Sequence, residues 1–291
     1  MKLPSRRTLL CCAALLSTLL MHSLGQAQGL LEKARRQGFV TIGFANEIPF
    51  AYADKGVLTG ADAEVTREVL KRMGIKEMVG VLTEFQSLIP GLMAGRFDMT
   101  AGMYIRPARC AQILFTNPNL ALGDSIVVKA GNPKGVLSYA DVARRADFVL
   151  GYNAGATGIL DNIRGAAIPP ERVLTFPDDP AALAAVKAGR IDGFANTAIG
   201  NISLLGRLQD PALDRASPFQ QPTVKGQPLL NFEGMGVRKA DKEFRDEFNR
   251  HLAQFVGTKE HQALLAPFGI TDAEIRPTIG QQADEICKTA S

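Results

Sequence analysis

The segment 102–110 brings together residue types that could bind a small anion. It contains Tyr104 and, five residues later, Arg109, beside the free backbone groups of Gly102. The guanidinium of arginine matches a carboxylate bidentately and keeps its charge where water is excluded. The residues just before, 97–101, read as a strand, and open α/β sheets bind ligands at strand ends. The segment therefore predicts a pocket for a small carboxylate.

Short apolar strands alternate with amphipathic helices from Gly38 onward, which is typical of wound α/β sheets. In a first block we expect strands at residues 39–44, 79–85 and 97–101 and helices at 62–73 and 87–94. In a second block we expect strands at residues 148–152, 173–176 and 191–194, a helix from Thr157, and a helix capped by Asp179. A strand at 124–129 leaves the first block, one near 228–232 returns, and a strand at 235–237 and a helix at 241–257 follow.

The two blocks share a short pattern that indicates two similar lobes. In each, a helix is followed by Ala-Gly-Arg, an apolar residue and Asp, at residues 94–98 and 188–192. We predict an α/β fold in which 28–125 and 229–291 form lobe 1 and 126–228 form lobe 2. Two crossover strands would join the lobes and leave a cleft that a hinge can close.

Residues 1–27 have the pattern of a secretory signal peptide. Arg6 and Arg7 precede an apolar run at 9–20, and small residues up to Ala27 offer a cleavage site. The run is too short for a stable membrane anchor. We expect cleavage near Ala27 and export to the periplasm, with general and twin-arginine export both open.

Most of the basic charge lies in this leader. The chain has a formal net charge of +4, and residues 1–27 carry three cations and no acid, so +1 remains. No clustered basic face argues for nucleic acid. Beyond the leader the histidines are His251 and His261, without a partner cysteine, so neither a metal site nor another cofactor is predicted.

Two cysteines, Cys110 and Cys287, lie beyond the leader. An oxidising compartment permits a disulfide between them, which would tie the C-terminal segment to the loop that carries Arg109. The spacing alone leaves two separate thiols equally open.

The ordered phrases of the chain resemble a known family. The segment 102–109, the turn 155–158 and the segment 188–192 resemble the solute-binding proteins of polar amino acid ABC importers, which have the type II periplasmic binding protein fold. The phrases at 43–47, 87–92, 101–104 and 109–110 are similar to the branch that binds ectoine and hydroxyectoine. The resemblance implies a receptor without enzymatic activity that delivers its solute to the transmembrane subunits of a permease, and we expect a monomer.

The resemblance implies that Arg109 holds the carboxylate of the ligand, beside Gly102. From the residues alone, Arg109 could instead pair on the surface. In the second lobe, Thr157 could donate to the same carboxylate or serve only as a helix N-cap, and Asn153 could assist. Arg106 has no match in the family, and we place it on the rim.

Thr197 bears on the kind of solute. Related amino acid receptors carry an acid at this position to hold the α-ammonium group, and residues 193–197 contain none. Because an unpaired buried charge is costly, an ordinary α-amino acid is disfavoured, and a carboxylate with a delocalised cation, such as ectoine, is favoured. Glu47 would then pair with the N–H groups of the solute ring, unless it is a solvated loop acid.

Phe50, Phe85 and Tyr104 follow three separate strands and could enclose such a cation. Ordinary core packing is the alternative. Phe85 stands where the resemblance implies a tyrosine, and Tyr52 could add a wall.

Two other functions stay open. One is an amino acid receptor of the same family. The other is an exported enzyme on this fold, similar to cyclohexadienyl dehydratases, which would need a general acid. Glu47 is the candidate for that role.

Overall fold

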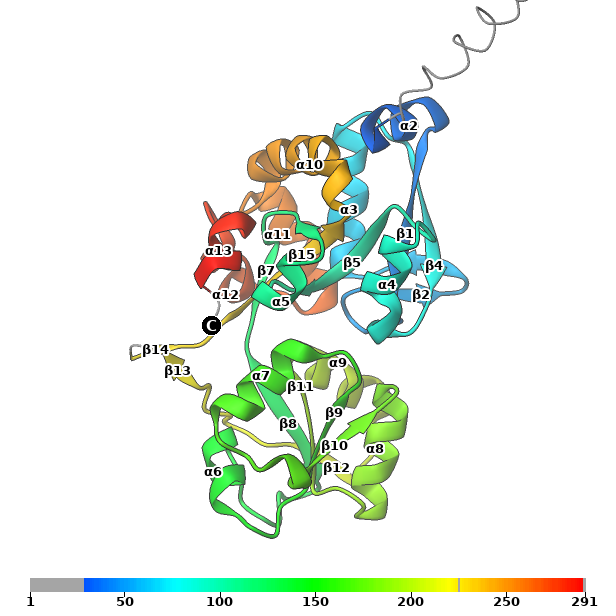
Figure 1. Ribbon diagram of the computed structural model, residues 1–291. Helices are drawn as coiled ribbons and strands as arrows, with labels where there is room; N and C mark the ends of the chain where they lie inside the picture. Colours follow the sequence, from blue (N-terminus) through cyan, green and yellow to red (C-terminus); the bar gives the residue numbers. More distant parts are fainter. Residues whose placement is uncertain (1–28, 225, 290–291) are drawn as a thin grey trace, which may run out of the picture.

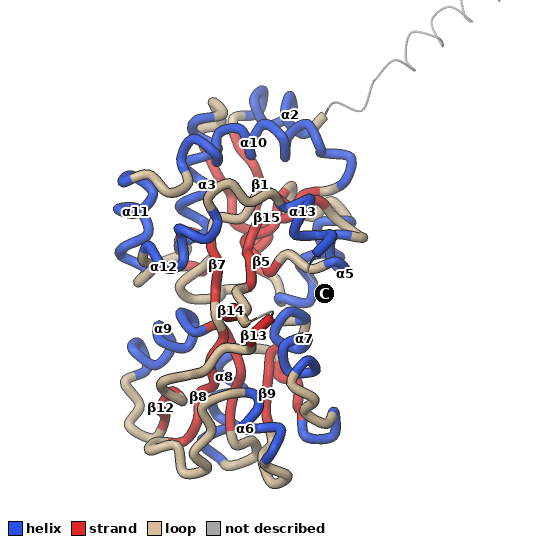
Figure 2. The backbone as a smooth tube through the Cα atoms, turned by 90° about the vertical axis from the view of Figure 1, so that its left-hand side faces the viewer, coloured by secondary structure: helices blue, strands red, loops and turns tan. Residues whose placement is uncertain are grey.

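The computed structural model describes residues 29–224 and 226–289. The predicted signal peptide lies outside them. The described chain forms two α/β bodies, one above the other, with the chain crossing between them (Figure 1). Seen from the side, each body has its strands inside and its helices outside (Figure 2). No helix of the described residues has both the length and the apolar character that a membrane crossing requires.

The sheet of lobe 1 has the order β4-β1-β5-β15-β6, and β7 also pairs with β15. Its strands are β1 (Phe39–Phe44), β4 (Glu77–Leu82), β5 (Met99–Tyr104), β6 (Leu114–Phe115), β7 (Leu120–Leu122) and β15 (Asn231–Val237). β1 is parallel to β4 and β5, whereas β15 is antiparallel to its neighbours. A separate hairpin consists of β2 (Tyr52–Asp54) and β3 (Val57–Thr59).

Helices from both ends of the chain surround this sheet. They are α2 (Leu30–Gln37), α3 (Ala61–Arg72), α4 (Leu88–Met93), α5 (Pro107–Cys110), α10 (Lys242–Phe255), α11 (Lys259–Leu265), α12 (Asp272–Ile275) and α13 (Ala283–Thr289). Short 3-10 turns are η1 (Phe85–Ser87), η3 (Lys239–Asp241), η4 (Ala266–Phe268) and η5 (Arg276–Thr278). The predicted apolar face of α10 is buried, with Phe244, Phe248, Leu252 and Phe255 in the core, and each such side chain contributes about 1.5–3 kcal/mol.

The sheet of lobe 2 has the order β10-β9-β11-β8-β12. Its strands are β8 (Asp124–Lys129), β9 (Leu150–Asn153), β10 (Val173–Phe176), β11 (Gly193–Thr197) and β12 (Leu213–Arg215). Around them lie α6 (Tyr139–Arg144), α7 (Thr157–Gly165), α8 (Asp179–Ala188), α9 (Ala198–Leu208) and η2 (Pro170–Arg172). β9, β10 and β11 are parallel, and β8 is antiparallel to β11.

The chain passes between the two sheets twice. It goes from β7 directly into β8, and it returns through a segment that holds the small hairpin of β13 (Thr223–Val224) and β14 (Gln227–Pro228) before β15 begins. We propose these two passages as the lobe boundaries, at 125/126 and 228/229.

Two predicted elements differ from the structure. The strand predicted at 79–85 is β4, which ends at Leu82 because its pairing partner β1 ends opposite it at Phe44. Phe85 therefore begins η1. The strands predicted near 228–232 and at 235–237 are one strand, β15, because β5, β6 and β7 together give it partners along its whole length.

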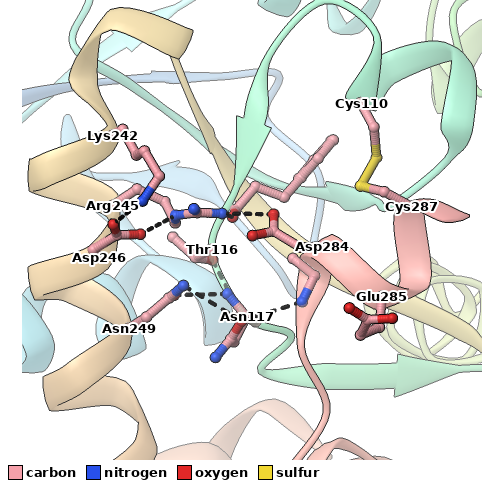
Figure 3. A network of polar contacts seen from close by, with 12 residues as sticks. Cys110, Thr116, Asn117, Lys242, Arg245, Asp246, Asn249, Asp284, Glu285 and Cys287 are labelled. Atoms are coloured by element: carbon pink, nitrogen blue, oxygen red, sulfur yellow. Dashed lines mark hydrogen bonds and ion pairs between the residues drawn. A yellow bond between two sulfur atoms is a disulfide. The ribbon is translucent and has the colours of Figure 1, made fainter.

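A disulfide joins the end of α5 to α13. The Cys110 and Cys287 sulfur atoms are 2.01 Å apart, and the residues are separated by 177 positions in sequence. Figure 3 shows that polar contacts also hold α13. Arg245 of α10 donates to Asp284 at 2.8 Å, and the Asn117 side chain accepts from the Ala283 N–H at 3.1 Å. The C-terminal helix is thus fastened beside the segment that carries Arg109.

We expect this disulfide to contribute much of the stability of lobe 1. The Cys110→Ala/Cys287→Ala variant should lose about 2–4 kcal/mol of unfolding free energy, because the cross-link restricts the unfolded chain. Urea unfolding monitored by circular dichroism measures the loss. A change below 0.5 kcal/mol, on the order of a surface substitution, would show that the polar contacts of α13 suffice.

Candidate ligand-binding site

A cavity lies between the lobes, where the carboxyl ends of parallel strands from both sheets face each other. From lobe 1 it is lined by Glu47, Ile48, Phe50, Phe85, Gly102, Met103, Tyr104, Arg109 and Glu233. From lobe 2 it is lined by Ala156, Gly158, Ile159, Asp179, Asn196 and Thr197. The space is open to solvent on one side, and its lining of apolar side chains with a few polar and charged groups is typical of a site for one small molecule.

Arg109 reaches from lobe 1 to lobe 2. It is only 5% exposed, and it donates to the Tyr104 carbonyl at 2.8 Å and to the Gly155 carbonyl at 2.9 Å. Its Cζ lies 5.5 Å from the centre of the Phe85 ring. Burial and the nearby Arg106 lower the pKa of Arg109 to about 10, so the guanidinium is still charged at neutral pH. The cavity therefore has one strong anion-binding group.

Glu47 and Phe50 reach the cavity from one tight turn after β1. The Glu47 carbonyl accepts from the N–H groups of Phe50 and Ala51, both at 2.9 Å. The start of α3 holds this turn, since the Asp62 N–H donates to the Phe50 carbonyl at 2.9 Å. A side chain at Gly60 would place its Cβ 2.3 Å from the same carbonyl oxygen, at φ +120°, so this position requires glycine.

The electrostatics of Glu47 favour its neutral form. Burial, then repulsion from Asp179 and Asp62, raises the pKa of Glu47 to about 8, although Arg109 opposes the shift. Glu47 is therefore largely protonated at neutral pH unless a cation lies beside it.

Asp179 is a cavity residue that the sequence reasoning missed. We expected it to cap α8, and this was wrong: Asp178 is the cap, and its side chain accepts from the Ala181 N–H at 2.8 Å. Asp179 instead accepts from the side-chain amides of Asn153 at 2.6 Å and Asn196 at 3.3 Å. Of two adjacent acids only one can cap a helix, and the Asp-Asp pair after β10 was the signal for a second role.

This placement also corrects the argument made from Thr197. No acid stands at Thr197, but lobe 2 does present a carboxylate to the cavity, from Asp179. Burial raises the pKa of Asp179 to about 6, so most of it is charged at neutral pH.

The other residues that we predicted in lobe 2 differ in whether they line the cavity. Thr197 lines the cavity, and its hydroxyl caps α9 by accepting from the Gly200 N–H at 3.0 Å. Asn153 is buried behind Asp179 and does not line the cavity. Thr157 is exposed and lies outside it, because the start of α7 turns Gly158 and Ile159 inward instead.

A pair of buried acids lies under Gly102. The carboxyl groups of Glu233 and Asp62 both lie against Gly102, and Asp62 accepts from the Asn119 amide at 2.7 Å. Burial and the adjacent Asp62 raise the pKa of Glu233 well above its usual value, so Glu233 is neutral beside Asp62. A Cβ at Gly102 would lie 2.2 Å from Asp62 Oδ2 and 2.4 Å from Glu233 Oε1. Glycine at 102 therefore makes room for this pair.

The three predicted aromatic side chains, Phe50, Phe85 and Tyr104, all line the cavity. Tyr52 does not, since it is buried with the Arg207 guanidinium 4.7 Å from its ring centre. Arg106 is not on the rim as predicted. It is buried, with its Cζ 5.7 Å from the Tyr104 ring centre, because the Asn231 side chain accepts from it there.

A polar cluster joins Tyr104 to the strands that connect the lobes. Asp124, the first residue of β8, accepts from the hydroxyls of Tyr104 at 3.3 Å and Tyr139 at 2.9 Å. It also accepts from the amides of Asn162 at 2.7 Å and Asn231, the first residue of β15, at 3.1 Å. Tyr104 in the cavity wall is thus bonded to Asp124 at the start of β8 and, through Asp124, to Asn231 at the start of β15.

Two glycines of lobe 2 allow the lobes to touch. A Cβ at Gly155 would lie 2.7 Å from the Gln86 Cα, and a Cβ at Gly158 would lie 2.4 Å from the Tyr104 ring. Any larger residue at these positions would push the lobes apart.

Comparisons with known proteins identify the family of the chain. Residues 40–270 match the family model of bacterial extracellular solute-binding proteins, family 3. A probable amino-acid ABC transporter periplasmic-binding protein of Sinorhizobium fredii is 36% identical over 279 residues, which is 94% of this chain and 91% of that protein.

Solved structures give the same result. The crystal structure of EhuB in complex with hydroxyectoine is 31% identical, has a TM-score of 0.77, and covers 89% of this chain and 97% of that one. An ancestral amino acid-binding protein, a precursor of cyclohexadienyl dehydratase, is 23% identical with a TM-score of 0.68, over 82% of this chain and 98% of that one, and shows the shared fold alone. The predicted family and type II fold are confirmed. This chain belongs to the bacterial extracellular solute-binding proteins of family 3, the solute-binding receptors of amino-acid-type ABC importers.

Proposed function

We propose that this receptor works in the periplasm, after removal of residues 1–27, and captures a small zwitterionic carboxylate with a delocalised cation. Ectoine and hydroxyectoine are the solutes we favour, and the permease of the importer receives them. The observation that carries this proposal is the composition of the cavity, in which one buried guanidinium is set against several carboxyl groups and three aromatic rings.

Each part of such a solute has a matching group. Its carboxylate would pair with Arg109, which is buried and charged. Its ring would lie among Phe50, Phe85 and Tyr104, whose faces favour a delocalised cation by about 0.5–2 kcal/mol each. Its N–H groups would donate to Glu47. The hydroxyectoine named for EhuB supports the same class of ligand.

An α-amino acid is the second candidate, and one observation favours it. Asp179 lines the cavity from lobe 2, so a carboxylate is available for an α-ammonium group although Thr197 is not an acid. The relative from Sinorhizobium fredii, which is described as a probable amino-acid receptor, points in the same direction.

Calorimetry on the mature chain separates these candidates. Ectoine and hydroxyectoine should bind with dissociation constants of about 1 μM or below, equivalent to about −8 kcal/mol. Glycine betaine should not bind, since it has no N–H group to donate. Tight binding of arginine, histidine or glutamine with none of ectoine would establish the amino acid receptor instead.

An enzymatic role is tested on the same sample. Protonated Glu47 would be the general acid of a dehydratase, so prephenate and arogenate are incubated with the protein and products are sought. We expect no turnover, and product formation that Glu47→Gln abolishes would contradict a pure receptor.

A further inference from the structure

Asp179 is held in a fixed position at the cavity. Asn153 at the end of β9 and Asn196 in β11 both donate to its Oδ1. Within the described part of the chain, neither Asp179 nor Glu47 has an ion-pair partner within 4.0 Å, and no side chain donates a hydrogen bond to the Glu47 carboxyl group. Two acids that line one cavity thus lack a close cation.

These acids belong to different lobes. Glu47 follows β1 in lobe 1, and Asp179 begins α8 in lobe 2. When both are ionised they repel each other, which opposes closure of the lobes over the cavity. A cation between them reverses the sign of the interaction, because each carboxylate then gains a charge-assisted hydrogen bond only when the lobes are together.

We propose that Glu47 and Asp179 hold the cation of the solute from opposite lobes, and that Asp179 is a specificity-determining residue. This inference rests on the proposed function and adds the cationic half of the site to it. A ligand can favour the closed state only through contacts that are stronger in that state, and the Glu47–Asp179 pair supplies such a contact.

The pair defines the chemistry of the cation. It must donate N–H groups on two sides, as an amidinium, a guanidinium or a protonated amine does. A fully alkylated ammonium ion has the charge but no N–H, so it cannot bridge the two carboxylates. Arg109 then fixes the direction of the solute by holding its carboxylate.

Binding should also release a proton. The charged and titratable groups that face Glu47 are Asp179 on α8, Arg109 on α5, Asp62 on α3 and Glu233 on β15. With its pKa near 8, Glu47 is mostly protonated at pH 7, and a bound cation favours its ionised form. Affinity should therefore rise with pH by at most about tenfold per unit between pH 6 and pH 8 and level off above pH 8, and it should fall more steeply below pH 6, where Asp179 is protonated as well.

The test compares Asp179→Asn, Glu47→Gln and the control Asp178→Asn in the mature chain. Asp178 is the neighbouring acid, caps the same helix and does not line the cavity. With ectoine as ligand, calorimetry should show an affinity about tenfold to thirtyfold lower for Asp179→Asn and for Glu47→Gln. The affinity of Asp178→Asn should change less than threefold. Repeating the titration in buffers of different ionisation enthalpy should show proton release for the unmodified protein and none for Glu47→Gln.

A second probe separates this inference from the proposed function. Acetamidinium carries the delocalised cation without a carboxylate, and tetramethylammonium carries the charge without N–H groups. A concentration of about 50 mM saturates a site whose dissociation constant is on the order of 1 mM. At this concentration acetamidinium should raise the melting temperature of the protein more than tetramethylammonium does. Asp179→Asn should remove the difference, and Asp178→Asn should keep it.

Each outcome decides something. If ectoine binds and Asp179→Asn changes its affinity less than threefold, the inference fails and the proposed function stands. If ectoine does not bind but the acetamidinium effect depends on Asp179, the Glu47–Asp179 pair stands and the proposed solute is wrong. If neither probe binds, both are overturned.

Discussion

Arg109→Lys should lower the affinity for the zwitterionic solute by about two to three orders of magnitude. Lysine keeps the charge but loses the planar fork that pairs with a carboxylate. It also cannot maintain the two bonds by which Arg109 joins the Tyr104 and Gly155 carbonyls across the lobes. Truncating one partner of a buried, hydrogen-bonded charge pair costs about 2–5 kcal/mol, which sets the size of the effect.

Calorimetry with ectoine measures the loss for Arg109→Lys. The control is Arg96→Lys, since Arg96 is exposed and lies away from the cavity, and its affinity should match that of the unmodified protein. Thermal unfolding checks that both variants are folded. An Arg109→Lys protein that binds within threefold of the unmodified one would show that the solute carboxylate lies elsewhere.

Gly158→Ala should weaken binding by about 30-fold to 100-fold while lobe 2 remains folded. The added Cβ would lie 2.4 Å from the Tyr104 ring. That ring cannot turn away easily, because Asp124 accepts from its hydroxyl and the Arg106 guanidinium lies over its face. The lobes must then stay apart, and the contacts that form only on closure are lost.

Gly165→Ala is the matched control for this prediction. It lies on the same helix, α7, and its added Cβ would have no atom within 4 Å. Its affinity should change less than twofold, and alanine should stabilise the helix by up to about 1 kcal/mol. Small-angle scattering reports closure directly: ligand should reduce the radius of gyration of Gly165→Ala but not of Gly158→Ala. Equal compaction of both variants would contradict the proposed contact.

The parts of the site that follow strands could be predicted from the sequence. Strand ends are marked by the change from apolar runs to Gly, Pro and polar residues, and parallel strands place those ends at one edge of a sheet. Glu47, Phe50, Phe85 and Tyr104 all lie just after, or at, the end of such a strand, and all line the cavity. The repeated pattern before β5 and β11 likewise predicted two similar lobes.

Two kinds of feature could not be predicted from the sequence. One is which of two neighbouring residues at the start of a helix faces the cavity, and the other is the pairing of strands that are far apart in the chain. Thr157 points outward because the first turn of α7 presents its neighbours to the cavity. Asp179 lost the capping role to the residue before it. Glu233 meets Asp62 only because β15 runs antiparallel to β5, with Glu233 opposite Tyr104, and no local pattern reveals a register between segments so far apart.

The disulfide has a topological consequence. Its two cysteines are 177 residues apart, and every strand of the second sheet lies between them. Lobe 2 therefore lies within a loop of the chain that the disulfide closes beside Arg109. A single cut by a protease in either connecting passage leaves the two fragments joined. Lobe 2 separates from lobe 1 only when both chain crossings are cut.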